Sequence, residues 1–232
     1  MEKFELYGVE FERMGAREAA GRIKRFLRAR EHSCVFTPNF QMVRAAARSS
    51  HIREMLGSAD LLLPDGVGIT LLCRASGGER VPRITGIDTA HFVLRYAARR
   101  SLSVYLLGAQ DGVAALAAKR LAREIPDLKI CGVHHGYFDK APYSRQNLEL
   151  LQKIRRAKPD IVFVCFGFPA QEEWILQNRS RLPSVRLFMG LGGVLDVWSG
   201  RVRRAPVCFR VLGLEWLWRC VREPRRFARL FK

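Results

Sequence analysis

The residue best placed for chemistry is Asp65, which stands in the segment Pro64-Asp65-Gly66 directly after a short apolar run. A carboxylate at such a point can act as a general base that takes a proton from an attacking hydroxyl. An aspartate between proline and glycine is, however, most often a turn-forming residue. Thr37 and Asn39 follow another apolar run, and such residues commonly cap strand ends and helix starts. The local sequence therefore marks Asp65 as a candidate base and leaves the turn interpretation open.

Further polar or glycine-rich segments follow the other apolar runs. They are Gly108-Ala109-Gln110-Asp111-Gly112, Gly167-Phe168-Pro169-Ala170-Gln171-Glu172 and Gly190-Leu191-Gly192-Gly193, with Asp196 three residues beyond the last. Glycine lets a backbone approach phosphate closely, and the amides at the start of a following helix attract anions. Taken singly, Gly108 and Gly190 are more often simple tight turns. Their convergence at several strand ends predicts a cleft for a phosphorylated ligand.

Arg83 is a candidate for stabilising negative charge in that cleft. If the ligand reacts by losing a diphosphate, negative charge grows on that leaving group. A divalent metal can neutralise this charge, and such a metal is commonly held by an Asp-x-Asp motif. This sequence has no Asp-x-Asp. Without a metal, the charge falls to arginine, glutamine and backbone donors. Arg83 is positioned for that role in Pro82-Arg83-Ile84-Thr85-Gly86-Ile87-Asp88, although a solvated surface arginine is the common alternative. We expect no metal or other cofactor.

These residues must be positioned by an α/β fold, because short apolar runs alternate with helix-like segments. The expected strands are Cys34–Thr37, Asp60–Leu63, Ser103–Leu107, Lys129–Val133, Asp160–Phe166 and Arg186–Met189. The expected crossover helices are Gln41–Leu56, Thr89–Arg100, Gly112–Ile125, Arg145–Ala157 and Gln171–Arg181. Continuous apolar runs are typical of strands buried on both faces. The pattern predicts a Rossmann-like, mostly parallel sheet with flanking helices, preceded by a small hairpin and a helix over Ala16–Arg30.

Length, composition and cysteine spacing indicate where such a protein is located and which kinds of site it lacks. The 232 residues are 48% hydrophobic, enough for a substantial core. No uninterrupted apolar stretch approaches the roughly 18 residues of a membrane span, and the first residues lack the layout of a signal peptide, so we expect a cytoplasmic protein. The six cysteines form no CxxC pair and have no histidine at ligand spacing, so we expect neither a disulfide framework nor a zinc site.

A formal charge of +18 directs the protein toward polyanions. Residues 201–232 hold ten basic and two acidic residues, so we divide the chain into a core, 1–200, and a basic helical appendage, 201–232. Arg219, Arg222 and Arg226 recur at helical spacing, and Trp216 adds an interfacial aromatic residue. A basic helix with aromatic side chains is typical of binding at an anionic membrane surface. Packing against the core and a nucleic-acid patch are the two alternatives.

Together with Arg204-Ala205-Pro206, Leu214-Glu215-Trp216 and Glu223-Pro224-x-Arg226, these motifs occur in an order that resembles the WecG/TagA/CpsF family of glycosyltransferases over essentially the whole chain. The resemblance implies an inverting, metal-independent enzyme. Better-known members transfer N-acetylmannosamine, or its uronic acid, from UDP to N-acetylglucosamine linked to undecaprenyl diphosphate. In the family the basic appendage docks on the inner face of the membrane, and monomers are held to be active although oligomers are known.

The resemblance also implies roles for single residues. Asp65 is similar to the family's catalytic base, with Thr37 and Asn39 beside it. Arg83 and Gln171 resemble contacts to the donor's diphosphate or sugar, and Asp196 resembles an acid on the nucleotide side. Membrane or acceptor-diphosphate contacts are implied for the appendage, at Arg204, Trp216, Arg219, Arg222 and Arg226.

Three other functions remain to be compared with this one. A member of the same family could use another UDP-hexose in capsule or exopolysaccharide synthesis. A basic nucleic-acid-binding module would show a helix-turn-helix, OB or RRM signature, and none is apparent, so we expect no nucleic-acid partner. An oxidoreductase would need G-x-G-x-x-G after the first strand, and no such loop follows Cys34–Asn39.

Overall fold

The computed structural model describes residues 2–29, 31–75, 81–211, 214–215 and 217–218. Its main sheet has six parallel strands in the order β4-β3-β8-β7-β5-β6. In chain order they are β3 (Ser33–Phe36), β4 (Leu61–Leu62), β5 (Ser103–Gly108), β6 (Lys129–His134), β7 (Ile161–Cys165) and β8 (Leu187–Gly190). All six expected strands are therefore present, and the Rossmann-like α/β class is confirmed.

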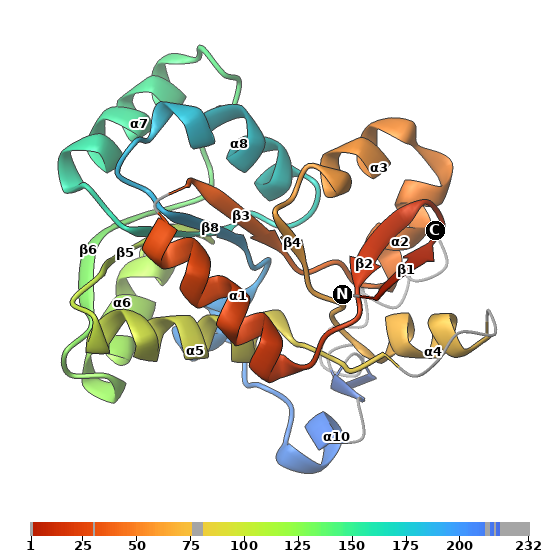
Figure 1. The fold of residues 1–232 in the computed structure, drawn as a ribbon. Helices are drawn as coiled ribbons and strands as arrows, with labels where there is room; N and C mark the ends of the chain where they lie inside the picture. The colour runs from red at the N-terminus through yellow and green to blue at the C-terminus, as the bar shows by residue number, and fades with distance from the viewer. Residues whose placement is uncertain (1, 30, 76–80, 212–213, 216, 219–232) are drawn as a thin grey trace.

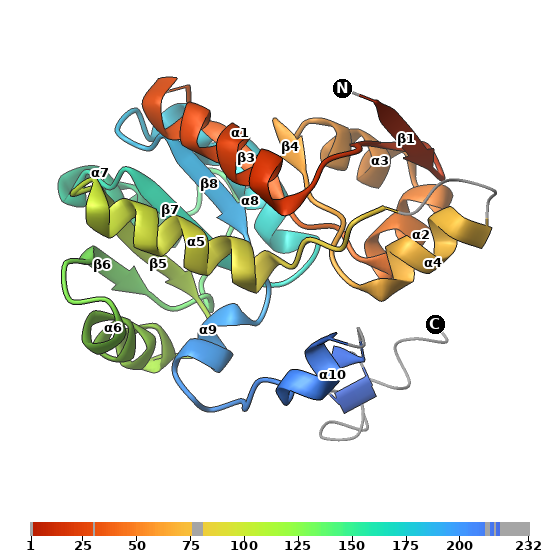
Figure 2. The ribbon, with the colours of Figure 1, turned by 60° about the horizontal axis from the view of Figure 1, so that its bottom comes forward.

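Helices cover both faces of the sheet (Figures 1 and 2). One face carries α1 (Ala16–Ala29), α5 (Gly86–Arg99), α6 (Val113–Glu124) and α9 (Val194–Trp198). The other carries α2 (Phe40–Arg48), α3 (Ser50–Gly57), α7 (Arg145–Ala157) and α8 (Ala170–Asn178). Alternate side chains of β5 enter the two cores, Val104 and Leu106 on the first face and Tyr105 and Leu107 on the second. Burial on both faces explains why the strands read as unbroken apolar runs.

Shorter elements surround this sheet. The expected N-terminal hairpin is present as antiparallel β1 (Lys3–Leu6) and β2 (Val9–Glu12), and it packs into the second core. The remaining described elements are α4 (Val67–Ala75), the 3-10 helix η1 (Arg179–Arg181) and α10 (Val207–Val211). Among the described residues, no helix combines the length and the apolar character that crossing a bilayer requires.

Several helix boundaries differ from the sequence prediction, and helix caps explain two of the differences. The single helix expected over Gln41–Leu56 is two helices, because Ser49 has extended backbone angles and its hydroxyl caps α3 by accepting from the Ile52 N–H at 3.4 Å. Helix α5 begins at Gly86 rather than Thr89, because Thr85 is its N-cap. Helical periodicity continues through both positions, so only the caps reveal the true ends.

The chain reverses direction across the sheet at the carboxyl ends of β5 and β7. The connection from β5 to β6 runs through α6 on one face, whereas β7 leads to β8 through α8 on the other. Ligands of open parallel sheets bind at such a switch point. Gly108 ends β5 there with φ +142°, and a Cβ on it would overlap the carbonyl oxygen of Cys165. Only glycine allows the two strand ends this close approach.

We predict that Gly108→Ala lowers the free energy of unfolding by about 3 kcal/mol, because the added methyl group overlaps the β7 backbone. Gly112→Ala is the matched control: its φ is +76°, and a Cβ there would meet no atom within 4 Å. The control should lose about 1 kcal/mol, from backbone strain alone. Urea unfolding of both variants measures the difference, and equal losses would contradict the steric account.

Candidate active site

The loops after β4, β3, β8 and β7 meet at one edge of the sheet, because these parallel strands are neighbours. Asp65 follows β4, and its Oδ2 accepts a hydrogen bond from the Gly86 N–H at 3.2 Å. Its own N–H donates to the carbonyl oxygen of Pro38 at 2.9 Å. Two backbone contacts thus fix a half-buried carboxylate at the edge where ligands of such sheets bind.

Thr37 joins Asp65 to the neighbouring loop. Its hydroxyl donates to the carbonyl oxygen of Gly190, at the end of β8, at 3.3 Å. A Cβ on Gly86 would lie 2.9 Å from the same hydroxyl oxygen, so Thr37 also packs directly on the residue that holds Asp65. The structure therefore brings together Thr37 and Asp65, which the sequence placed after separate strands.

Gln171 and Glu172 form a buried polar pair beneath this edge. The Gln171 side-chain oxygen accepts from the N–H groups of Gly167 and Gly192, at 3.2 and 2.8 Å. Its amide nitrogen donates to Glu172 Oε1 at 2.7 Å. Gln171 is 4% exposed, so in this structure it fixes two glycine loops from below.

Glu172 is fully buried, and burial raises its pKa to about 7, against a smaller opposing effect of the Gln171 hydrogen bond. Its Oε2 has no hydrogen-bond partner within the part of the chain that the structure describes. A Cβ on Gly190 would lie 3.2 Å from Glu172 Oε1, so this carboxyl group lies directly against the end of β8. Close to neutral pH the group is therefore divided between its protonated and ionised forms.

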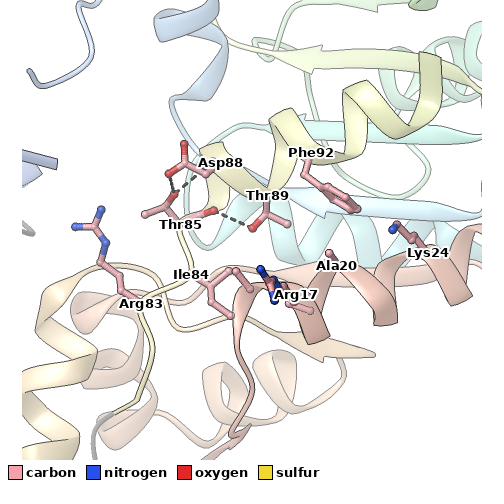
Figure 3. Close-up of a pocket in the computed structure, with 11 residues that line it drawn as sticks. Arg17, Ala20, Lys24, Arg83, Ile84, Thr85, Asp88, Thr89 and Phe92 are labelled. Atoms are coloured by element: carbon pink, nitrogen blue, oxygen red, sulfur yellow. Dashed lines mark hydrogen bonds between the residues drawn. The ribbon is translucent and has the colours of Figure 1, made fainter. Parts of the chain in front are cut away.

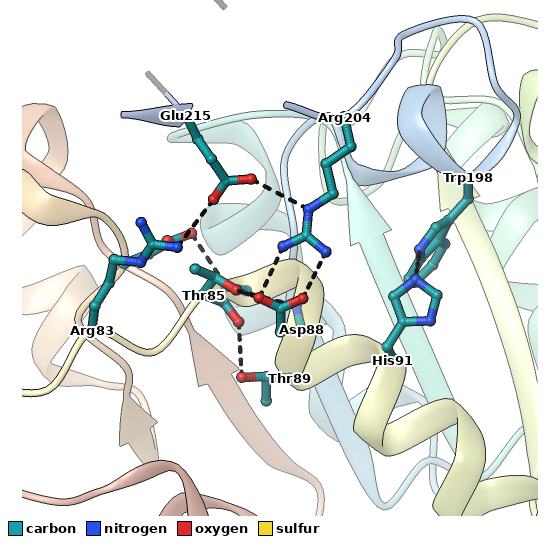
Figure 4. Close-up of polar contacts among 10 residues, drawn as sticks. Arg83, Thr85, Asp88, Thr89, His91, Trp198, Arg204 and Glu215 are labelled. Atoms are coloured by element: carbon teal, nitrogen blue, oxygen red, sulfur yellow. Dashed lines mark hydrogen bonds and ion pairs between the residues drawn. The ribbon is translucent and has the colours of Figure 1, made fainter. Parts of the chain in front are cut away.

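Ion pairs connect the start of α5 to the C-terminal segment (Figure 4). Arg204 binds both oxygens of Asp88, at 2.7 and 2.8 Å, and its Nε lies 3.3 Å from Glu215. Glu215 also pairs with Arg83 Nη2 at 3.4 Å. Burial opposes ionisation of Asp88, but hydrogen bonds from Arg204 and Thr85 outweigh it and lower the pKa of this carboxyl group. These pairs fix Arg83, which lies three residues before Gly86, the residue whose N–H binds Asp65.

A histidine beside this network is held neutral. The Trp198 Nε1–H donates to His91 Nε2 at 2.9 Å, so that nitrogen must be unprotonated. Burial lowers the pKa of His91, and the charge of Arg204 acts in the same direction. Trp198 belongs to α9, so the contact fixes α9 against α5.

Comparison with known proteins decides the family. The model of the "Glycosyl transferase WecG/TagA/CpsF family" matches residues 4–232. The chain belongs to this family. A protein of Bacillus subtilis (strain 168) is 32% identical over 208 residues, which cover 89% of this chain and 78% of the relative. One of Staphylococcus aureus (strain MW2) is 31% identical over 230 residues, which cover 98% and 88%. Both are named N-acetylglucosaminyldiphosphoundecaprenol N-acetyl-beta-D-mannosaminyltransferase.

As a member of the WecG/TagA/CpsF family, the chain is a glycosyltransferase. The two remaining predicted site residues, Asn39 and Asp196, both lie at the start of a helix. The Asn39 side chain caps α2 by accepting from the Gln41 and Met42 N–H groups. Asp196 lies in the first turn of α9, after the Gly190–Gly193 loop. Direct contact of either with substrate stays a prediction.

The predicted appendage lies mostly beyond the described residues. Arg204 is described, and its guanidinium is bound to Asp88 and Glu215. The others predicted to contact a membrane or the acceptor diphosphate lie outside the described residues, namely Trp216, Arg219, Arg222 and Arg226. The division at residue 200 stays a prediction.

Sequence reasoning assigned no role to Glu172, Asp88 or Glu215. A signal existed for Asp88, since Thr85-x-x-Asp88 is the spacing of a reciprocal helix cap, and the two side chains do bond to each other. For Glu172, no feature of the local sequence indicated that the side chain would be fully buried. Glu215 lies 132 residues from Arg83 in the chain, a separation that local patterns do not bridge.

We predict that Glu172 makes stability fall with rising pH. In the unfolded chain this carboxyl group ionises near its ordinary pKa of 4.5, whereas in the folded chain it ionises only near 7. The stability it contributes is complete below the lower value and is lost as pH rises through the higher one, up to about 3 kcal/mol at about 1.36 kcal/mol per pKa unit. Glu172→Gln, which cannot ionise, should remove this dependence.

Urea unfolding at pH 5 and pH 8 measures the effect. Glu173→Gln is the matched control, because Glu173 is the next residue of α8 and its side chain is 39% exposed. This variant should retain the wild-type dependence on pH. If Glu172→Gln also retains it, the buried carboxyl group is not its source.

Proposed function

We propose that this glycosyltransferase moves N-acetylmannosamine, or its uronic acid, from a UDP-sugar to N-acetylglucosamine linked to undecaprenyl diphosphate. The names of the relatives from Bacillus subtilis and Staphylococcus aureus support this acceptor and this sugar. The observation that carries the proposal is the Asp65 carboxylate, oriented by the Gly86 N–H at the ligand-binding edge of the sheet and adjoining the Arg83 segment. A base held by the segment that also carries a cation suits the transfer of a sugar from a diphosphate.

In this mechanism Asp65 is the general base. It accepts the proton of an acceptor hydroxyl while that oxygen forms a bond to the anomeric carbon of the donor. The bond from the same carbon to the UDP oxygen breaks on the opposite face, and UDP leaves with the bonding electrons. A single displacement of this kind inverts the configuration at the anomeric carbon. The Gly86 N–H keeps the carboxylate in place throughout.

The leaving diphosphate is stabilised by fixed protein groups. The Arg83 side chain is only 22% exposed, so its charge is weakly screened compared with that of a surface arginine. The N–H groups of Gly167 and Gly192 already donate to the Gln171 side-chain oxygen, so Arg83 is the donor on which this account rests. With Arg83 in this role, the reaction requires no divalent metal.

We predict that Asp65→Asn lowers kcat by about 10²- to 10⁴-fold, the usual contribution of a general base. The asparagine oxygen can still accept from the Gly86 N–H, so the fold and the affinity for UDP should be retained. Product analysis with a panel of UDP-sugars and a lipid-diphosphate-linked N-acetylglucosamine acceptor measures transfer, and calorimetry measures UDP binding. Asp127→Asn is the control, because Asp127 is exposed in the loop before β6, at the opposite edge of the sheet.

Each part of the proposal can fail separately in this assay. Unchanged turnover of Asp65→Asn would remove Asp65 as the base. A product from another UDP-hexose alone would reassign the donor within the same reaction class. Loss of wild-type turnover in EDTA would contradict the metal-free mechanism.

The basic C-terminal residues are proposed to bind an anionic membrane surface, where the lipid-linked acceptor resides. Arg219, Arg222 and Arg226 recur at helical spacing in a stretch rich in cations and aromatic residues. Cations near an anionic surface each add about 1 kcal/mol of binding. The polyprenyl acceptor and the enzyme would then meet at the same surface.

A chain that ends at Trp218 tests this role. It keeps Arg204 and Glu215, and with them the ion pairs to the core. We predict that the full chain sediments with phosphatidylglycerol vesicles and that the shortened chain binds at least about a hundredfold more weakly, given about 1 kcal/mol per lost cation. High salt should release the full chain. Undiminished binding of the shortened chain would place the membrane contact elsewhere.

A further inference from the structure

A cavity of about 590 Å³ lies between α1 and α5. Ala16, Ala19 and Ala20 of α1 form one wall, and Phe92 of α5 contributes to the other, with Ile84 among the lining residues. Figure 3 shows Arg17 and Lys24 on α1 and Phe92 on α5 among the lining residues. This volume is within the roughly 300–1,000 Å³ of ordinary ligand sites. We call this space the α1–α5 cavity.

Three cations line this apolar space, namely Arg17, Lys24 and Arg83. Arg17 is exposed and, among the described residues, forms no hydrogen bond or ion pair. Lys24 lies 5.4 Å from the centre of the Phe92 ring. The single acid in the lining is Asp88, which Arg204 already neutralises. The cavity therefore suits a ligand that is partly apolar and carries negative charge near Arg17.

The cavity adjoins the candidate base. Ile84 lines it, and the Ile84 N–H donates to the carbonyl oxygen of Pro64, the residue before Asp65, at 3.1 Å. Two residues later, the Gly86 N–H donates to the Asp65 carboxylate. Arg83 precedes this segment and lines the cavity as well. A ligand that extends from the cavity past Arg83 thus reaches the segment that orients Asp65.

We propose that the α1–α5 cavity binds the diphosphate and the first isoprene units of the polyprenyl acceptor. This assignment rests on the proposed function. In the acceptor the sugar, the diphosphate and the apolar chain follow one another, and the protein offers Asp65, then Arg17, then Ala20 and Phe92 in the same order. Arg17 has its donors available for phosphate oxygens, because it forms no hydrogen bond or ion pair among the described residues.

The test compares acceptors that differ only in the chain. N-acetylglucosaminyl diphosphates with a farnesyl chain or a methyl group are used with the full-length protein. Ala20→Trp should fill the cavity and raise KM for the farnesyl acceptor about tenfold more than KM for the methyl acceptor, as expected when roughly two methylene groups remain in water. Ala20→Leu, a smaller change at this half-buried position, should shift the same ratio in the same direction.

Ala29→Trp is the matched control, because Ala29 is exposed at the end of α1 and outside the cavity lining. It should leave the ratio of the two KM values as in the wild type. Arg17→Gln should raise KM for both acceptors, because both carry the diphosphate. An equal effect of Ala20→Trp on both acceptors, or an equal shift of the ratio by Ala29→Trp, would overturn the proposal.

Binding measured without a donor separates this proposal from the proposed function. The wild type should bind the farnesyl compound more tightly than the methyl compound, and Ala20→Trp should abolish that preference. If this result is obtained but no sugar is transferred, the cavity assignment holds and the proposed reaction fails. If transfer occurs but neither compound is preferred, the reaction holds and the cavity assignment fails.

Discussion

The ion pair between Arg204 and Asp88 links the parts of the chain on which the candidate active site depends. It lies at the first turn of α5, where Thr85 caps the helix and Gly86 holds Asp65. Asp88 remains 57% exposed, and exposed ion pairs contribute only about 0–1 kcal/mol to stability. Its effect is therefore positional, because two hydrogen bonds from one planar guanidinium fix the direction of the C-terminal segment as well as its distance.

The Gln171–Glu172 pair lowers the stability of the fold in order to position loops at the candidate active site. An apolar residue at position 172 would avoid the penalty of a buried carboxyl group with one unpartnered oxygen. With the carboxyl present, the Gln171 amide nitrogen has an acceptor, and its oxygen remains oriented toward the N–H groups of Gly167 and Gly192. Departures from the most stable choice are expected at functional sites, and this one sets the shape of two glycine loops.

The sequence predicted the sheet well because its strands are buried on both faces, and such strands are unbroken apolar runs. It also placed Thr37 and Asp65 at strand ends, but their contact depends on β3 and β4 being neighbours, which no local pattern specifies. The break at Ser49 was missed because helical periodicity continues through it. The pairs of Arg83 and Arg204 with Glu215 depend on the path of the chain after Gly200, where the alternation of strands and helices ends.

Charge connects the fold to the reaction proposed for it. Donor and acceptor each carry a diphosphate, and their approach within one site brings like charges together, a repulsion that grows as water is excluded. A divalent metal is one way to offset it, and fixed cations are another. Arg83 lies three residues before Gly86, which binds Asp65, and it is proposed to stabilise the leaving donor diphosphate; Arg17 lies on the α1–α5 cavity, where the acceptor diphosphate is proposed to bind. In the proposed reaction, a chain of net charge +18 uses one type of residue, from α1 to the C-terminal segment, for both anions and for the membrane surface.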